Sequence, residues 1–94
     1  SFGWNDATHN LVGEASQLMN GYDATPEGQA SYLAQLLDLC NSVGGSVRGV
    51  CYWAPEWVAF KGPNASDGST WENQALFDFQ NRALPGLDSL GGAK

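Results

Sequence analysis

Apolar side chains fall at consecutive positions in residues 47–53, where a half-exposed strand would alternate apolar with polar. Such a run predicts a β-strand buried on both faces, as in a parallel sheet. Pro55 ends the run because proline has no N–H to give to a β-ladder. Trp53 and Trp57 stand at and just beyond the C-terminal end, which is where parallel α/β folds place their ligand sites. Both could instead be ordinary core residues.

A helical pattern precedes this run. Thr25, Pro26 and Glu27 give an N-cap, a proline at the first helical position and an acid in the first turn. Apolar residues then recur at intervals of three and four: Ala30, Leu33, Leu36, Leu37 and Cys40. Gly44 and Gly45 follow, and glycine favours helix ends. We therefore expect an amphipathic helix over 25–43.

An aromatic loop, a helix, a glycine turn and a buried strand follow one another, which is the second half of a βαβ crossover. A strand apolar on both faces needs a strand on each side and helices outside it. These 94 residues offer one such strand, which alone would expose an unpaired edge. We expect an α/β fold that is part of a larger barrel or sheet. Its remainder is absent or lies on another chain.

Shorter signals indicate the other segments. Residues 1–24 are expected to be mostly loop, with one or two helical turns within 13–19, and residues 58–70 are also loop. The spacing of Ser69 and Glu72 matches a capping box. Residues 80–82 predict a turn in which Asn81 takes the left-handed conformation. Residues 85–90 predict a last helical turn.

Charge and composition exclude several classes of partner. The net charge is −6, with only four basic residues, so we expect no nucleic-acid partner. No apolar run approaches the roughly 20 residues that span a bilayer, and no segment has the features of a signal peptide. The lysine-poor, aromatic-rich composition is typical of secreted proteins that handle neutral sugars.

Cys40 and Cys51 are expected to be buried free thiols, because the predicted helix and strand separate them.

The first loop contains Asp6, His9 and Asn10 at close spacing. These side chains could bind a cation, although a polar loop that satisfies its own hydrogen bonds is the more ordinary interpretation. Asn64 lies in an N-x-S glycosylation sequon.

Three blocks of the chain resemble the endo-β-1,4-galactanases of glycoside hydrolase family 53. Residues 49–57, GVCYWAPEW, are similar to a GVFYWEPxW segment of that family. Residues 71–79, WENQALFDF, continuing through Arg82-Ala83-Leu84-Pro85, resemble its ending, and residues 24–29 resemble the start of its seventh barrel helix. The likeness extends over nearly all of the chain.

The resemblance implies that residues 1–94 are the C-terminal fragment of a single (β/α)8 TIM-barrel domain, comprising the seventh helix, the eighth strand (47–53) and a closing segment. It further implies retaining hydrolysis of β-1,4-galactan by two glutamates about 5–5.5 Å apart. Both of those glutamates lie upstream of Ser1 in the family pattern. Hence no catalytic residue is expected in this chain, and no cofactor.

The resemblance also implies a sugar platform, that is, aromatic side chains on which a sugar ring stacks. Trp53 matches the strand-eight tryptophan beneath the subsite where the bond breaks, and an indole face suits the C–H face of galactose. Phe2 matches an aromatic position in the same subsite, and Trp4 and Trp57 are further candidates for substrate binding. Ala54 replaces the family's glutamate. The paired aspartates of the family's calcium loop are missing from residues 5–10, so no metal is expected.

The implied partners are β-1,4-galactan and the remainder of the barrel, as an upstream segment or a separate chain, and the implied location is secreted or periplasmic. Two alternatives stay open. One is a non-catalytic galactan-binding module that uses the same aromatic residues. The other is a related barrel that acts on mannan or glucan, since such barrels share a strand-eight tryptophan.

Overall fold

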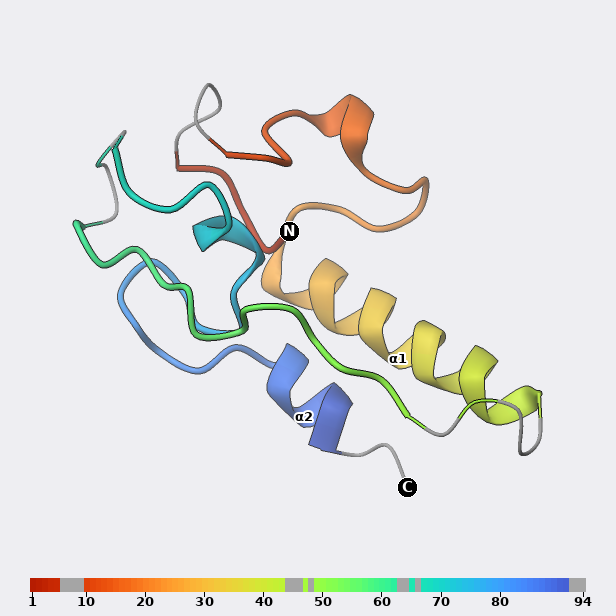
Figure 1. Ribbon diagram of the computed structural model, residues 1–94. Coiled ribbons are helices and arrows are strands. Elements are labelled where there is room, and N and C mark those ends of the chain that lie inside the picture. The colour runs from red at the N-terminus through yellow and green to blue at the C-terminus, as the bar shows by residue number, and fades with distance from the viewer. Residues whose placement is uncertain (6–9, 44–46, 48, 63–64, 66, 92–94) are drawn as a thin grey trace.

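The computed structural model describes residues 1–5, 10–43, 47, 49–62, 65 and 67–91. Its elements, in order, are the 3-10 turn η1 (Ala15–Gln17), the helix α1 (Pro26–Ser42), the 3-10 turn η3 (Glu72–Gln74) and the short helix α2 (Gly86–Gly91). Figure 1 shows α1 and α2 side by side at one end of the molecule. The segments before α1 and between residues 54 and 84 lie together at the other end.

Helix α1 begins where the sequence predicts. The Thr25 hydroxyl accepts a hydrogen bond from the Gly28 N–H at 2.9 Å, and Pro26 occupies the first turn. Leu33 and Leu37 are buried, as the apolar spacing predicts. Gln29, one helical turn before Leu33, is buried beside them although its side chain is polar. The predicted helix is therefore confirmed.

Helix α2 confirms the predicted last turn and packs against α1. Gly86 lies so close to α1 that an added Cβ would stand 3.2 Å from the Leu33 side chain. The Ser89 hydroxyl donates to the Ala30 carbonyl at 3.0 Å. A small residue and a hydroxyl thus allow the two helices to approach closely.

The predicted strand over 47–53 is absent: residues 47 and 49–53 form no β-ladder. An isolated antiparallel bridge between Phe77 and Ala83 is the β-pairing found among the described residues. Residues 49–53 instead run as an extended segment past α1 and α2 (Figure 1). A strand needs a neighbouring strand to accept its backbone hydrogen bonds, and the described residues supply none. Over the described residues the structure is therefore helical and irregular.

The predicted turn at 80–82 is confirmed. Asn81 has φ 64°, and the Asp78 N–H donates to the Arg82 carbonyl at 2.8 Å. The 3-10 turn η1 also falls inside the segment where helical turns were expected. The prediction of a capping box at Ser69 is wrong. The Ser69 hydroxyl accepts from the Trp71 N–H, and the Glu72 carboxylate is buried, where it accepts from Asn5.

The apolar core is small. Among the described residues it consists of one aromatic, four leucines and two alanines: Phe2, Leu33, Leu37, Leu76, Leu84, Ala59 and Ala75. Both cysteines are free, as predicted, but Cys51 is exposed and Cys40 only partly covered. The expectation that both are buried is wrong because nothing in the described structure covers the outer side of residues 49–53. No described helix is long and apolar enough to cross a bilayer.

Candidate functional site

Two tryptophans meet at the end of the extended segment. Trp53 is 69% exposed and Trp57 is 43% exposed, and their ring centroids lie 6.2 Å apart in an edge-to-face arrangement. Between them Ala54 has φ 53°, and the Trp57 N–H donates to the Ala54 carbonyl at 3.2 Å. This turn reverses the chain after Trp53, so the two indoles share one surface.

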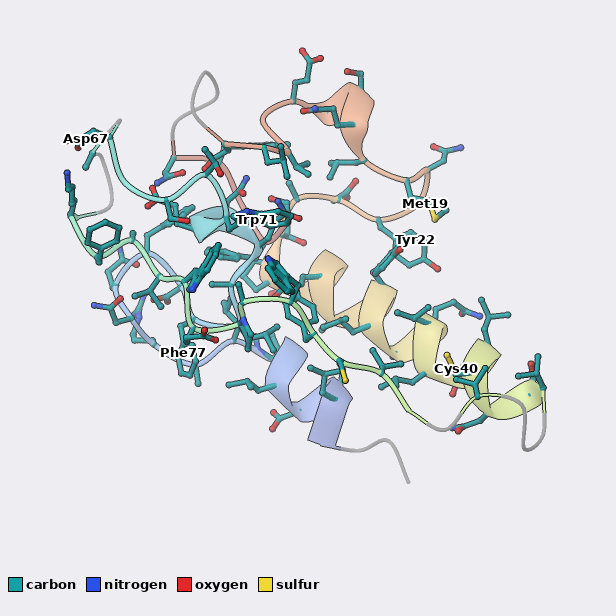
Figure 2. All side chains as sticks on the ribbon, viewed as in Figure 1. Met19, Tyr22, Cys40, Asp67, Trp71 and Phe77 are labelled. Carbon is teal, nitrogen blue, oxygen red and sulfur yellow. The ribbon has the colours of Figure 1, made fainter. Side chains whose placement is uncertain are left out.

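A cavity of about 380 Å³ opens beside Trp53. One wall comes from α1, another from the loop before α1, and a third from residues near η3. The residues that line it on these three sides include Gln29, Tyr32, Leu18, Met19, Tyr22, Trp71 and Gln74. In Figure 2, Trp71 lies near the centre of the molecule, and Met19 and Tyr22 lie on the loop above α1. Aromatic rings mixed with amide and hydroxyl groups suit a neutral polar ligand.

The residues on either side of Trp53 are held by the segment 72–76. The Tyr52 hydroxyl donates to the Gln74 carbonyl at 2.7 Å, and the Leu76 N–H donates to the Pro55 carbonyl at 2.9 Å. Trp53 itself stays open to solvent, so its indole projects from a backbone that is fixed before and after it.

Helix α1 is tied into the same network through Gln29. Its Nε2 donates to the Ala75 carbonyl at 2.9 Å and, more weakly, to the Tyr52 hydroxyl at 3.5 Å. Burial raises the pKa of Tyr52; the hydrogen bond from Gln29 opposes that rise, and the nearby Tyr32 adds to it. The Tyr52 hydroxyl therefore remains a neutral donor.

Asn73 fixes the first segment of the chain. It is fully buried, and its Nδ2 lies 3.2 Å from Ser1 Oγ, 3.1 Å from the Gly3 carbonyl and 2.8 Å from the Val12 carbonyl. The backbone carbonyl of Asn73 accepts from the Phe2 N–H at 2.9 Å. Asn73 thus joins residues 1–3 and Val12 to the segment after residue 70.

Glu72 belongs to this network rather than to an open site. Its buried carboxylate accepts from Asn5 Nδ2 at 2.5 Å, and the Asn5 oxygen accepts from Asn10 Nδ2 at 2.8 Å. These contacts show that Asn10 belongs to a polar loop that bonds to its own neighbours. Asp6 and His9, the other two cation candidates, lie outside the described residues, as does Asn64.

The four predicted sugar-binding residues lie in two places. Trp53 and Trp57 are brought together, and Trp53 lines the cavity. Phe2 is only 4% exposed and packs on Phe79 at 4.7 Å between centroids, so no open ring face remains for a sugar. Trp4 is exposed but, like Phe2, does not line the cavity. No group of three possible metal-binding side chains occurs in the part of the chain that the structure describes.

Sequence reasoning missed Tyr52, Gln29 and Gln74 as residues that position the site. In the sequence, Tyr52 stands within an apolar run, which favours a core role for its ring. Its hydroxyl is the signal that it also forms a hydrogen bond. Gln29 precedes Leu33 by one helical turn, so a buried amide on the core face of α1 could have been inferred. Nothing in the sequence indicates which backbone carbonyls these side chains meet, because those partners are 22 to 46 residues away.

The model of glycosyl hydrolase family 53 matches residues 1–90. An arabinogalactan endo-beta-1,4-galactanase of Cellvibrio japonicus is 40% identical over 83 residues, which are 85% of this chain and 21% of that protein. The arabinogalactan endo-beta-1,4-galactanase A of Emericella nidulans is 36% identical over 58 residues, 62% of this chain and 15% of that protein. The chain thus spans about a fifth or less of these relatives. No solved structure matches it at a significant level.

Proposed function

Since this chain belongs to glycosyl hydrolase family 53, we propose that it is part of a retaining endo-β-1,4-galactanase in which Trp53 supports a galactosyl unit. The names of its relatives, arabinogalactan endo-beta-1,4-galactanases, support this substrate. The observation that carries the proposal is the Trp53 indole, which is 69% exposed at the rim of a cavity while its neighbours are hydrogen-bonded in place.

An exposed indole on a fixed backbone is an effective sugar platform. One face of such a ring, on the order of 100 Å², contributes about 2–3 kcal/mol when the C–H face of a pyranose covers it, at ~25 cal/mol per Å². The sugar hydroxyls remain at the edge, free to bond to amide and hydroxyl groups of the kind that line the cavity. Stacking therefore orients the ring without replacing its hydrogen bonds.

The catalytic carboxylates are proposed to come from the remainder of the barrel, as an upstream segment or a separate chain. Glu72, the buried glutamate of this chain, accepts from Asn5 and is closed to a substrate. The family's fold is a (β/α)8 barrel. We assign α1 to its seventh helix and residues 47–53 to its eighth strand, which would gain a ladder from neighbouring strands. The extended path of residues 49–53 past α1 supports this assignment (Figure 1).

A secreted or periplasmic location is part of the proposal. It rests on a net charge of −6, four basic residues and a 12% aromatic content, which suit a protein that meets a neutral polysaccharide outside the cell. Detection of the protein in culture medium or periplasmic extract, and not in the cytosolic fraction, checks this part.

The experiment is a pair of substitutions in the complete barrel, Trp53→Ala and Trp53→Phe, assayed by reducing-sugar release from β-1,4-galactan. Loss of 2–3 kcal/mol of stacking in the transition state predicts a fall in kcat/KM of about 30- to 160-fold for Trp53→Ala. Trp53→Phe keeps part of the platform and should lose less. Leu39→Ala removes another exposed apolar side chain and should keep the wild-type rate.

Unchanged hydrolysis in Trp53→Ala would contradict the platform role. Mannan and glucan in the same assay test the alternative substrates, and preferential hydrolysis of either would replace galactan in the proposal.

A further inference from the structure

The loop before α1 contains a segment, residues 13–22, that is folded on itself. Gln17 Oε1 accepts from the Gly13 N–H at 2.7 Å and from the Glu14 N–H at 3.1 Å. Its Nε2 donates to the Leu11 carbonyl at 3.2 Å. Figure 1 shows this loop above α1, with the turn η1 within it. One glutamine side chain thus gives the segment a shape that does not depend on the rest of the protein.

Both ends of the segment are fastened, whereas its middle is not. On one side, Asn73 Nδ2 donates to the Val12 carbonyl at 2.8 Å. On the other side, the Asp23 carbonyl accepts from the N–H of the N-cap residue of α1 at 2.9 Å. In the part of the chain that the structure describes, the hydrogen bonds of residues 13–22 stay within the segment or reach Leu11. The segment can therefore move as a unit without breaking a hydrogen bond to the helices.

Gly21 has the geometry of a hinge at the end of this unit. Its φ is 93°, and an added Cβ would meet nothing within 4 Å. Glycine crosses between positive and negative φ at little steric cost, and hinges are short stretches that absorb such changes. Next to Gly21, the Tyr22 ring contacts the Tyr32 ring of α1 edge to face, with centroids 5.3 Å apart. A single ring contact of this kind can form and break as the segment turns.

Apolar side chains of the segment lie at the mouth of the cavity beside Trp53. Leu18 and Met19 line that cavity, and Met19 is 63% exposed. A thioether side chain in this position is uncovered while the cavity holds no ligand. It gains apolar burial when the segment turns onto a bound ligand. Ligand binding and movement of the segment are thus coupled through Met19.

We propose that residues 13–22 form a lid, hinged at Gly21 and at the junction of Val12 and Gly13, that closes over a galactosyl unit in the cavity beside Trp53. Met19 covers the bound sugar in the closed state. Closure removes water from the hydrogen bonds between the sugar and the amide and hydroxyl groups of the cavity, which strengthens them. The lid rests on the proposed galactanase function, to which it adds a conformational step.

The first test measures the movement of the lid by pulsed electron paramagnetic resonance. Spin labels are placed at Asn20→Cys, in the lid, and at Asp38→Cys, on the exposed side of α1, in a complete barrel freed of reactive cysteines, Cys40 and Cys51 included. A saturating β-1,4-galacto-tetrasaccharide, mixed and frozen before hydrolysis, should change the mean distance by more than about 2 Å and narrow its distribution. Labels at Asp38→Cys and Gln80→Cys, outside the lid, are the control and should keep their distance.

The second test measures the contact that Met19 makes in the closed state. Met19→Ser should raise KM for the tetrasaccharide about tenfold, with a smaller change in kcat, because the closed lid then lacks its apolar contact. Met19→Leu keeps an apolar side chain and should restore KM. Leu11→Ser is the matched control, since Leu11 is exposed on the same loop but does not line the cavity, and it should keep the wild-type KM.

A label distance that stays the same in the saturated protein overturns the lid, and so does a wild-type KM in Met19→Ser. Hydrolysis of galactan by a barrel whose segment does not move overturns the lid alone. A barrel that neither binds nor hydrolyses galactan overturns the proposed function, and the lid with it.

Discussion

Single polar side chains decide where the candidate site lies. Tyr52, Gln29 and Asn73 each bond to backbone atoms far away in the sequence. A buried amide or hydroxyl that lost such a partner would cost about 1–3 kcal/mol. These residues therefore have one low-energy arrangement, and the tryptophans take their positions from it.

Asn73→Asp tests this at one atom. The substitution keeps the shape of the side chain but replaces the Nδ2 donor, which faces the Gly3 and Val12 carbonyls, with an oxygen that repels them. We expect a loss of at least about 3 kcal/mol in the free energy of unfolding of the complete barrel, measured with urea. Asn20→Asp, on an exposed loop residue, is the matched control and should change it by less than about 0.5 kcal/mol. Equal losses in both variants would refute the role of Asn73.

At the scale of elements, the N-terminal turn of α1 depends on a close approach. An added Cβ on Gly28 would clash with the Asp23 backbone, and the Asp23 carbonyl already accepts from the Thr25 N–H at 2.9 Å. The N-cap and the first turn are therefore packed against the loop that precedes them. Helix propensity alone gives the opposite preference, since alanine is favoured over glycine by about 1 kcal/mol.

Gly28→Ala separates the two effects. We expect it to destabilise the protein by about 1–3 kcal/mol, because the loop at 23–25 must shift and the N-cap weakens. Gly91→Ala, which meets nothing within 4 Å, should be neutral or slightly stabilising. Thermal unfolding of the complete barrel, followed by circular dichroism, compares them, and a stabilised Gly28→Ala would show that the close approach is unimportant.

The turn between Phe77 and Ala83 is organised by one carboxylate. Asp78 accepts from the Arg82 N–H and Gln80 N–H at 2.9 Å each and pairs with Arg82 Nε at 2.9 Å. These bonds lower the pKa of Asp78, the backbone hydrogen bond from Arg82 being the largest cause. The carboxylate is thus favoured in the folded state.

The sign of the pH effect follows from that lowered pKa. The contribution of Asp78 to stability is present above its unfolded pKa of about 4 and is lost as the pH falls through the lower folded pKa. The turn lies near the surface, so the loss should stay within about 1 kcal/mol. Unfolding free energies of the complete barrel, wild type and Asp78→Asn, measured from neutral to acidic pH, should converge in acid. A constant difference between them would contradict this account.

At the scale of the whole molecule, apolar surface outweighs the core. Among the described residues, seven apolar residues are buried, whereas large apolar side chains such as Leu39, Val43, Trp53 and Phe60 are exposed. Apolar side chains exposed in this number are available for contact with another part of a larger protein. The extended segment at 49–53 also carries backbone groups that no ladder occupies, which favours association with other strands.

The isolated 94-residue chain should therefore associate or remain molten, bind a hydrophobic dye and unfold without cooperativity. Dye fluorescence and analytical ultracentrifugation measure this, with a polypeptide that includes the remainder of the barrel as the control. A monomeric, cooperatively unfolding chain that galactan retains in affinity electrophoresis would favour the binding module instead.

The sequence by itself determined the features that rest on neighbouring residues. It was enough to predict the start of α1 from Thr25 and Pro26, the left-handed Asn81 and the final helical turn, because caps, turns and helical spacing act over a few positions. The family motifs also lie in the sequence, and they indicated the family. Only the tertiary structure decided which side chains meet. It placed Trp57 beside Trp53, buried Phe2 against Phe79, and left residues 47 and 49–53 without the expected ladder, because contacts and strand pairing depend on segments far apart in the chain.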